Sequence, residues 1–260
     1  MARRRGKGRN ASGTSVRERA YQHIKKLVAD GLLGPGAAVS ELLLAKELGS
    51  SRTPIREAMK QLDAEGLLEQ NRNGGMIVAQ LERDDIIELY ELREALEVYS
   101  VGRVASFPLR PADRDRLQFM LNQILALKGD LENQSQSELN EEQNRQFIES
   151  DLGFHALLMS MTGNSRIQKI LHDTRLLIRI FAIRRHRHSA KELASIYDHH
   201  QQILNAVAAQ DNEAAMKAMA AHIQTSQRER LNEYDHWRRE STLRQHLPEI
   251  FESRTPTVTS

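Results

Sequence analysis

The sequence predicts a mainly α-helical protein in two parts: a small N-terminal domain of short helices with a β-hairpin, and a larger, all-helical C-terminal bundle. Three observations support this fold class. The 260 residues include only 14 Gly and 6 Pro, and residues with a high helix propensity are abundant. Apolar residues recur at helical spacing through most of 84–240. Between 67 and 79, two short extended runs flank an Asn/Gly-rich turn, which is typical of a hairpin.

The composition restricts the class of protein. Hydrophobic residues make up 40% of the chain and charged residues 28%, which favours folded domains. Cysteine is absent, which excludes disulfides and thiolate metal sites and fits a reducing cytoplasm. No apolar stretch approaches the roughly 20 residues of a membrane span, and the basic N-terminus lacks the apolar segment of a secretory signal. We therefore expect a cytoplasmic protein without a membrane partner.

Charge is distributed unevenly along the chain. The formal net charge is +2, but residues 1–80 contain 14 Lys and Arg against 8 Asp and Glu, whereas 81–260 contain 23 against 27. A basic N-terminal part favours a polyanionic partner, and an acidic remainder argues against a chain that coats nucleic acid along its whole length. Taken alone, the charge also fits an uneven surface without function.

The domain organisation follows from these patterns. Residues 1–13 are basic and Gly-rich without large apolar side chains, so we expect a disordered arm that contacts phosphates or serves only as a solubilising tail. Residues 14–80 form the first domain, 81–240 the helical domain and 241–260 a tail. The helices expected in the second domain are 84–106, 111–128, 145–162, 164–187, 190–209 and 211–240. The polar segment 129–144 predicts a long surface loop or a solvated helical extension.

Two short helices and a hairpin define the first domain more closely. After a helix over 16–28, a second helix over 42–48 ends at Gly49, and a third begins after Ser51 and runs to Gly66. Ser51 is a suitable N-cap, and Pro54 lies in the first turn, where a missing N–H is tolerated. With the hairpin that follows, this order describes a winged helix-turn-helix.

The third helix divides into an apolar and a basic face. Its apolar residues fall at helical spacing and predict a buried stripe: Ile55, Ala58, Met59 and Leu62. Its basic residues lie four apart on another face: Arg52, Arg56 and Lys60. Arginine matches guanine O6 and N7 together, Ser51 and Thr53 can donate to phosphates, and the wing glycines Gly74 and Gly75 permit a close backbone approach. A solvated cationic face is the simpler alternative for the basic residues alone.

These residues resemble a known family. The run Ser51-Arg52-Thr53-Pro54-Ile55-Arg56-Glu57-Ala58, with Leu44-Ala45-Lys46-Glu47-Leu48-Gly49 before it and Glu65-Gly66-Leu67 and Gly74-Gly75 after it, resembles the GntR family of bacterial regulators over roughly 14–80. The resemblance implies a homodimer on palindromic operator DNA. Arg52 and Arg56 would read bases, while Thr53 and the wing glycines contact the backbone. Some members carry a cation where this sequence has Leu42.

The C-terminal half contains a candidate metal site. Asp151 and His155 are four residues apart and therefore share one helix face. His200 and His222 lie on two later predicted helices and can complete the set. Three imidazoles and a carboxylate suit a divalent transition metal, for which we expect Zn²⁺ or Ni²⁺. A surface hydrogen-bonded pair and two ordinary helical histidines are the alternative interpretation of the spacing.

A second resemblance covers about 85–235. The segments Asp151-Leu152-Gly153-Phe154-His155, Gly163-Asn164, His200 with Ile203-Leu204, and His222-Ile223 are similar to the FCD effector domain of the FadR subfamily. This implies an all-helical bundle that dimerises and binds a small organic acid, with Asp151, His155, His200 and His222 at the ligand positions of the metal-containing branch. Arg93 matches a position that lines the effector pocket, and a salt bridge with Glu97 is its alternative role.

The sequence thus predicts a ligand-responsive bacterial transcription regulator, a repressor, and not an enzyme. One alternative is a metal-dependent hydrolase or lyase that uses the four metal-site residues. The chain offers it no nucleophile motif or phosphate-binding glycine loop, and it leaves the basic recognition helix unexplained. The other alternative is a metal-free helical scaffold with structural histidines, which would bind no specific duplex.

Overall fold

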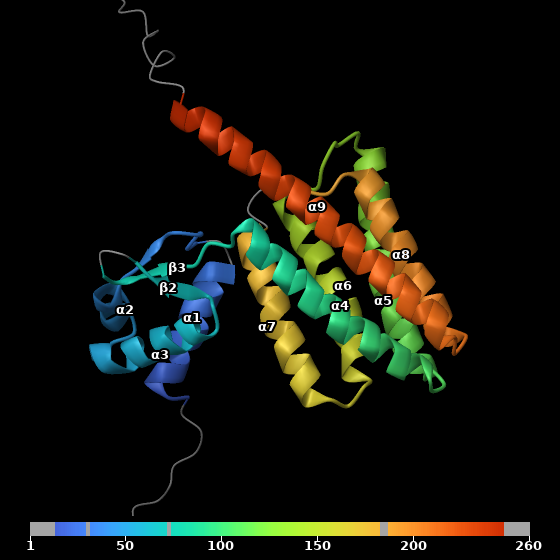
Figure 1. Cartoon of the computed structure of the whole chain (residues 1–260), viewed down its shortest axis with the longest axis horizontal. Helices are drawn as coiled ribbons and strands as arrows, with labels where there is room; N and C mark the ends of the chain where they lie inside the picture. The colour runs from blue at the N-terminus through green and yellow to red at the C-terminus, as the bar shows by residue number, and fades with distance from the viewer. Residues whose placement is uncertain (1–13, 30–31, 72–73, 183–186, 247–260) are drawn as a thin grey trace, which may run out of the picture. The chain divides into compact units, whose positions relative to one another are not determined.

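The structure is a computed structural model that describes residues 14–29, 32–71, 74–182 and 187–246 (Figure 1). Its described residues divide into two compact units: those up to residue 80 together with 179–181, and the remainder from residue 81 onward. The described residues form nine helices and a small antiparallel sheet, which confirms the predicted fold class. The arm expected over 1–13 and residues 247–260 of the expected tail lie outside the described residues. No helix in the described ranges is long and apolar enough to cross a membrane.

The N-terminal unit is a winged helix-turn-helix. In chain order it contains α1 (Val16–Ala29), β1 (Ala38–Val39), α2 (Glu41–Glu47), α3 (Arg52–Ala64), β2 (Leu68–Gln70) and β3 (Met76–Val78). The α3 stripe of Ile55, Ala58, Met59 and Leu62 is buried, as predicted, and α3 packs against α1, whose Ala20 and Ile24 are fully buried. Burial of this stripe fixes which face of α3 is turned outward.

The wing is a three-stranded sheet with the order β1-β3-β2. β2 and β3 form the predicted hairpin, with Glu69 opposite Ile77. β1 was not predicted, because two residues are too few to show alternating polarity. It pairs with β3 in an antiparallel ladder, with Ala38 opposite Ile77. In the turn before β1, Gly36 adopts φ +76° and donates its N–H to the Val78 carbonyl at 2.8 Å. The sheet therefore ties the segment before α2 to the wing.

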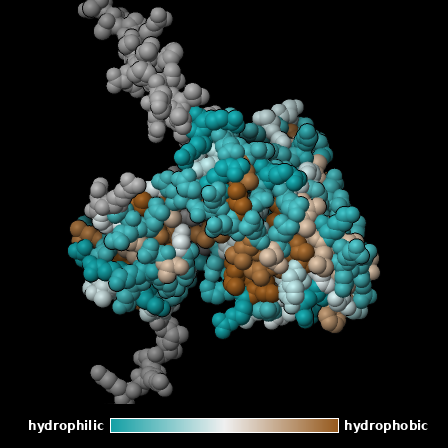
Figure 2. Space-filling view, viewed as in Figure 1, coloured by the Kyte–Doolittle hydropathy of each residue, from teal (hydrophilic) through white to brown (hydrophobic). Residues whose placement is uncertain are grey.

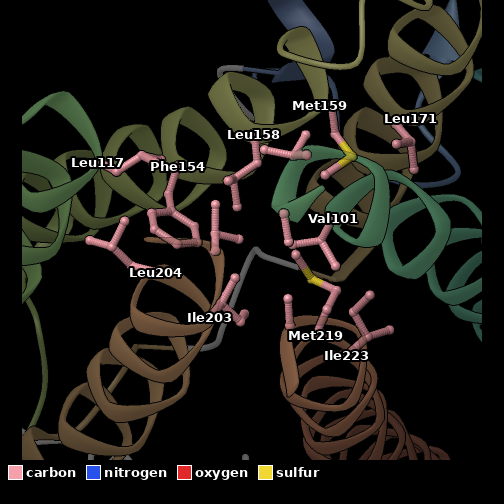
Figure 3. Packing of buried hydrophobic residues seen from close by; sticks show 14 of the residues in the cluster. Val101, Leu117, Phe154, Leu158, Met159, Leu171, Ile203, Leu204, Met219 and Ile223 are labelled. Carbon is pink, nitrogen blue, oxygen red and sulfur yellow. The ribbon is translucent and has the colours of Figure 1, made fainter. Parts of the chain in front are cut away.

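The C-terminal unit contains the remaining helices, apart from residues 179–181 near the end of the fourth of them. They are α4 (Arg83–Ala105), α5 (Pro111–Asn133), α6 (Glu141–Ser160), α7 (Ser165–Ala182), α8 (Ala190–Ala208) and α9 (Asn212–His246). All six helices were predicted. The helix expected over 164–187 corresponds to α7, which ends before residue 187. The helix expected over 211–240 corresponds to α9, which continues six residues further. The main core lies between them, and Figure 3 shows Val101, Phe154, Leu158, Ile203 and Met219 converging from α4, α6, α8 and α9.

Residues 129–144 do not form the long surface loop that was one of the two expectations. α5 continues to Asn133 and α6 begins at Glu141, which leaves only 134–140 as a connection. Nor is the helical extension merely solvated, because Leu131 and Leu139 are fully buried in a second apolar cluster with residues such as Phe147. Asn140 then caps α6 in a capping box with Gln143. The two leucines of this otherwise polar segment thus pack it against the rest of the bundle.

We expect Leu139→Ala to lower the free energy of unfolding by about 2–5 kcal/mol, because it removes a fully buried side chain and leaves a cavity. Urea denaturation followed by far-UV circular dichroism measures this. The neighbouring exposed residue provides a control, since Glu138→Ala should change stability by less than about 0.5 kcal/mol. Equal stability of both variants would contradict the anchored connection.

Candidate functional site

Helix α3 presents the predicted DNA-reading side chains to solvent. Ser51 occupies the N-cap position, although its side chain makes no capping hydrogen bond, and Pro54 lies in the first turn. The predicted contact residues of the helix are all exposed: Ser51, Arg52, Thr53, Arg56 and Lys60. Because the buried stripe holds the opposite face, these side chains share an accessible surface. Their contact with DNA remains a prediction.

The arginines of this surface are held by an acidic residue of α2. Glu41 Oε1 accepts from Arg56 Nε at 2.9 Å, and Glu41 Oε2 accepts from Nη2 of Arg56 at 2.9 Å and from Nη2 of Arg52 at 3.1 Å. The hydrogen bond from Arg56 is the largest influence lowering the pKa of Glu41 below its usual value. Sequence reasoning did not single out Glu41. Leu42 beside it is exposed.

The wing tip places both predicted glycines at the surface. Gly74 and Gly75 are exposed and adopt φ values of +78° and +92°. A side chain in this left-handed region would be strained, so glycine fits the turn. A Cβ built on either residue would meet nothing within 4 Å. The backbone here is therefore open to a close approach by a ligand.

The four predicted metal ligands converge in the C-terminal unit. Nε2 of His155 lies 3.1 Å from Nε2 of His200 and 3.1 Å from Nε2 of His222. Oδ1 of Asp151 lies 3.5 Å from His200 Nε2 and 4.0 Å from His155 Nε2. One ligand atom from each residue lies within 4.8 Å of all the others. The three imidazoles are buried, whereas the Asp151 side chain is 25% exposed.

Glu97 of α4 fixes the orientation of the His155 ring. Its Oε2 lies 2.7 Å from His155 Nδ1. Burial raises the pKa of Glu97, but Arg175 and Arg93 outweigh burial and hold that pKa well below its usual range. An ionised carboxylate only accepts hydrogen bonds, so Nδ1 carries the proton. In the neutral ring, Nε2 then has a free lone pair directed at the other ligands, as in a carboxylate–histidine–metal arrangement.

Burial keeps the three imidazoles neutral. Desolvation lowers the pKa of His155 below its usual value, lowers that of His200 to about 3, and lowers that of His222 well below 6.5. Phe154 stacks on the His200 ring at 4.4 Å between centroids and contributes to this burial. Only the neutral ring offers a lone pair to a metal. The Nδ1 atoms of His200 and His222 are buried without a hydrogen-bond partner in the described part of the chain.

Two family models match this chain. The model described as bacterial regulatory proteins of the gntR family covers residues 16–78, and the FCD domain model covers 88–225. The chain belongs to the GntR family. Its N-terminal unit is the GntR DNA-binding domain and its C-terminal unit contains an FCD domain, so both resemblances seen in the sequence are confirmed. Members of this family are transcription regulators that bind DNA.

Relatives with similar sequences are named as transcriptional regulators or repressors. The HTH-type transcriptional regulator YdhC of Bacillus subtilis is 30% identical over 78% of this chain and 85% of its own length. A probable D-xylose utilization operon transcriptional repressor of Paenarthrobacter nicotinovorans is 29% identical over 81% and 86%. The gluconate operon transcriptional repressor of Bacillus subtilis is 24% identical over 80% and 82%.

Solved structures share the fold of this GntR regulator. McbR/YncC of E. coli has a TM-score of 0.64 at 21% identity and covers 85% of this chain and 99% of its own. A putative GntR regulator from Rhodococcus sp. RHA1 has a TM-score of 0.61 at 23% identity, with coverage of 83% and 97%. At these identities the likeness concerns the fold alone.

The predicted effector residue of the FCD domain, Arg93, forms the alternative contact considered for it. Its Nε donates to Glu97 Oε1 at 2.9 Å, and both side chains are buried. Its terminal nitrogens make no hydrogen bond within the described residues. The salt bridge with Glu97 therefore does not exclude a contact between Arg93 and an effector, which stays a prediction. Arg175 of α7 also binds Glu97, through Nε at 3.2 Å and Nη2 at 2.6 Å. Sequence reasoning missed Arg175, which has no partner near it in sequence.

The neutral histidines predict an acid-sensitive fold in metal-free protein. As pH falls below about 6.5, histidines bind protons in the unfolded chain but not in the folded site. Their contribution to the free energy of unfolding is therefore complete above that pH and decreases toward pH 3. For His200, we expect a loss of about 2 kcal/mol between pH 7.5 and pH 5. The free energy of unfolding in urea with EDTA, measured at both pH values, tests this.

Two variants sharpen the measurement. His200→Gln should show a smaller stability difference between the two pH values than wild type, whereas His172→Gln, which changes an exposed histidine of α7, should show the same difference as wild type. An unchanged difference in His200→Gln would contradict a neutral, buried imidazole at this position.

Proposed function

We propose that this GntR regulator is a repressor that binds palindromic operator DNA as a homodimer and responds to a small carboxylate at a metal ion in its FCD domain. The observation that carries this proposal is the convergence of three buried, neutral imidazoles and one carboxylate: His155, His200, His222 and Asp151. The proposed role is regulation and not catalysis.

The donor set fits a divalent transition metal. Ligand atoms about 2.0–2.2 Å from one ion lie roughly 3.0–3.5 Å apart when they are neighbours in its shell, and three of the four measured separations fall in this range. Nitrogen and carboxylate oxygen ligands suit Zn²⁺ or Ni²⁺. When bound, the ion would supply positive charge and an open position for a carboxylate oxygen. The chain itself would hold the ion through these four residues, of which His155 is already oriented by Glu97.

The surrounding charges favour an anionic effector. Arg93 and Arg175 are buried near the ligands, and Glu97 and Asp151 balance them. A divalent ion adds two positive charges that no further described acidic group in this cluster neutralises. Arg93 uses only Nε toward Glu97, so its terminal nitrogens remain suited to a carboxylate. The names of the gluconate and D-xylose repressors also favour a sugar acid or a related small acid.

An apolar surface on the C-terminal unit supports dimerisation. Figure 2 shows hydrophobic residues gathered on the face that α4 and α7 form. Leu92 of α4 and Ile170 of α7 are 39% and 44% exposed. Exposed apolar area of this kind marks interaction surfaces. A two-fold dimer would present two α3 helices to two half-sites about one helical turn of DNA apart.

The metal site is tested by elemental mass spectrometry of protein purified without an affinity tag. We expect about one divalent ion per chain in wild type and none in His155→Ala, because that variant removes the ligand that Glu97 orients. His172→Ala, at an exposed histidine outside the site, should retain the ion. Wild-type protein without metal after incubation with Zn²⁺, Ni²⁺ and Mn²⁺ would refute the site.

The recognition helix is tested on a duplex selected by the wild-type protein from a random library. We expect Arg52→Ala and Arg56→Ala each to weaken binding on the order of ten- to a hundredfold and to relax base preference, since each removes a side chain that can contact guanine twice. Arg116→Ala removes the same charge from an exposed position on α5 and should change affinity little. Light scattering should find two chains per duplex.

Unchanged binding of both α3 variants would show that α3 does not read the bases. A complex with one chain per duplex would instead contradict the homodimer while leaving the recognition helix intact.

A further inference from the structure

An acidic side chain of α2 lies beside the basic residues of α3 in the winged helix-turn-helix. Glu41 is the first residue of α2, and its carboxylate contacts both arginines that we propose as base readers. Its side chain is 22% exposed, compared with 58% for Arg52 and 55% for Arg56. A carboxylate beside a phosphate-binding surface opposes DNA binding electrostatically. Its presence there therefore needs an explanation other than affinity.

Fold stability does not supply that explanation. Exposed ion pairs contribute little, commonly less than about 1 kcal/mol. The start of α2 is already capped by Ser40, whose hydroxyl accepts from the Leu43 N–H. The α2 and α3 helices also pack through buried residues such as Leu44, Ala45 and Ile55. Glu41 is thus not required to hold the two helices together.

The geometry of the Arg56 contact is informative. Arg56 donates to Glu41 through Nε and Nη2, which form one edge of the guanidinium. This leaves the end of the fork, formed by Nη1 and the remaining Nη2 hydrogen, for another acceptor pair. Guanine O6 and N7 form such a pair in the major groove. Glu41 can therefore hold Arg56 while Arg56 contacts guanine, and neither contact displaces the other.

We propose that Glu41 is a specificity-determining positioning residue that orients Arg56 for guanine and weakens the binding of this surface to non-operator DNA. The inference rests on the proposed role of Arg52 and Arg56 as base readers. A long arginine side chain loses several rotatable bonds when it binds, and prior fixation by Glu41 removes part of that entropic penalty. Where no guanine is present, the carboxylate repels the backbone and neutralises one cation without compensation.

Glu41 thus acts oppositely on correct and incorrect sites. On the operator, preorganisation of Arg56 offsets the repulsion between Glu41 and the phosphates. On other sequences, only the repulsion remains. This is discrimination by penalising the wrong partner as well as favouring the right one. Removing the charge of Glu41 should consequently raise binding to unrelated DNA without an equal gain on the operator, whereas the loss of a negative charge alone would raise both alike.

The test compares two duplexes of equal length and composition: one selected by wild-type protein from a random library, and a scrambled version of it. Dissociation constants are measured by fluorescence anisotropy for wild type, Glu41→Gln, Glu57→Gln and Arg56→Ala. We expect Glu41→Gln to bind the scrambled duplex more tightly than wild type does. The ratio of its affinities for the selected and the scrambled duplex should be about tenfold smaller than that of wild type.

Glu57→Gln is the matched control. It removes the same charge from an exposed residue of α3 that forms no hydrogen bond or ion pair with Arg52 or Arg56 among the described residues. It should therefore strengthen binding to both duplexes similarly and keep the ratio. The thermal unfolding midpoint of Glu41→Gln should remain that of wild type, which separates the effect from misfolding.

The outcomes distinguish this inference from the proposed function beneath it. If Arg56→Ala lowers the affinity ratio and Glu41→Gln leaves it equal to that of Glu57→Gln, the role of Glu41 is refuted and the recognition helix stands. If Arg56→Ala also leaves the ratio unchanged, Arg56 does not read bases, and both ideas fail together.

Discussion

The buried carboxylate of Glu97 is the interaction on which the organisation of the C-terminal unit depends. It is fully buried and receives hydrogen bonds from Arg93 on its own helix, from Arg175 of α7 and from His155 of α6. A buried charge is stable only when it is fully paired, and removal of one partner commonly costs about 3–5 kcal/mol. These contacts therefore fix α4, α6 and α7 relative to one another at the level of single atoms.

That constraint passes directly to the candidate metal site. Because Glu97 accepts from Nδ1 of His155, the neutral ring must direct Nε2 toward His200 and His222. The apolar core around the site, with Phe154 stacked on His200, keeps the rings neutral by excluding water. The same packing that stabilises the bundle thus orients the Nε2 lone pair of His155 and places two further neutral imidazoles beside it. Stability and site preparation are not separate properties of this domain.

The sequence predicted features that depend on local spacing and missed those that depend on pairing across elements. The α3 stripe ending at Leu62 and the pair Asp151–His155 follow from helical periodicity. His200 and His222 could only be suggested as further ligands from their place on later predicted helices, and the family resemblance strengthened that suggestion. β1 is too short to show a pattern. Glu41 and Arg175 acquire their roles from partners on other helices, and 35 acidic and 37 basic residues offer no way to choose those pairs without coordinates.

Both units contain a carboxylate paired with two arginines, exposed to solvent in one unit and buried in the other. In each, one carboxylate holds two guanidinium groups: Glu41 holds Arg52 and Arg56 near solvent, and Glu97 holds Arg93 and Arg175 in the interior. Water weakens the first arrangement, so it contributes little to stability and leaves the arginines exposed for the DNA contacts that we propose. Desolvation makes the second arrangement nearly permanent, because each partner would be left uncompensated if it separated. Burial therefore decides whether the same ion-pair chemistry forms an accessible surface, as at Glu41, or a fixed internal framework, as at Glu97.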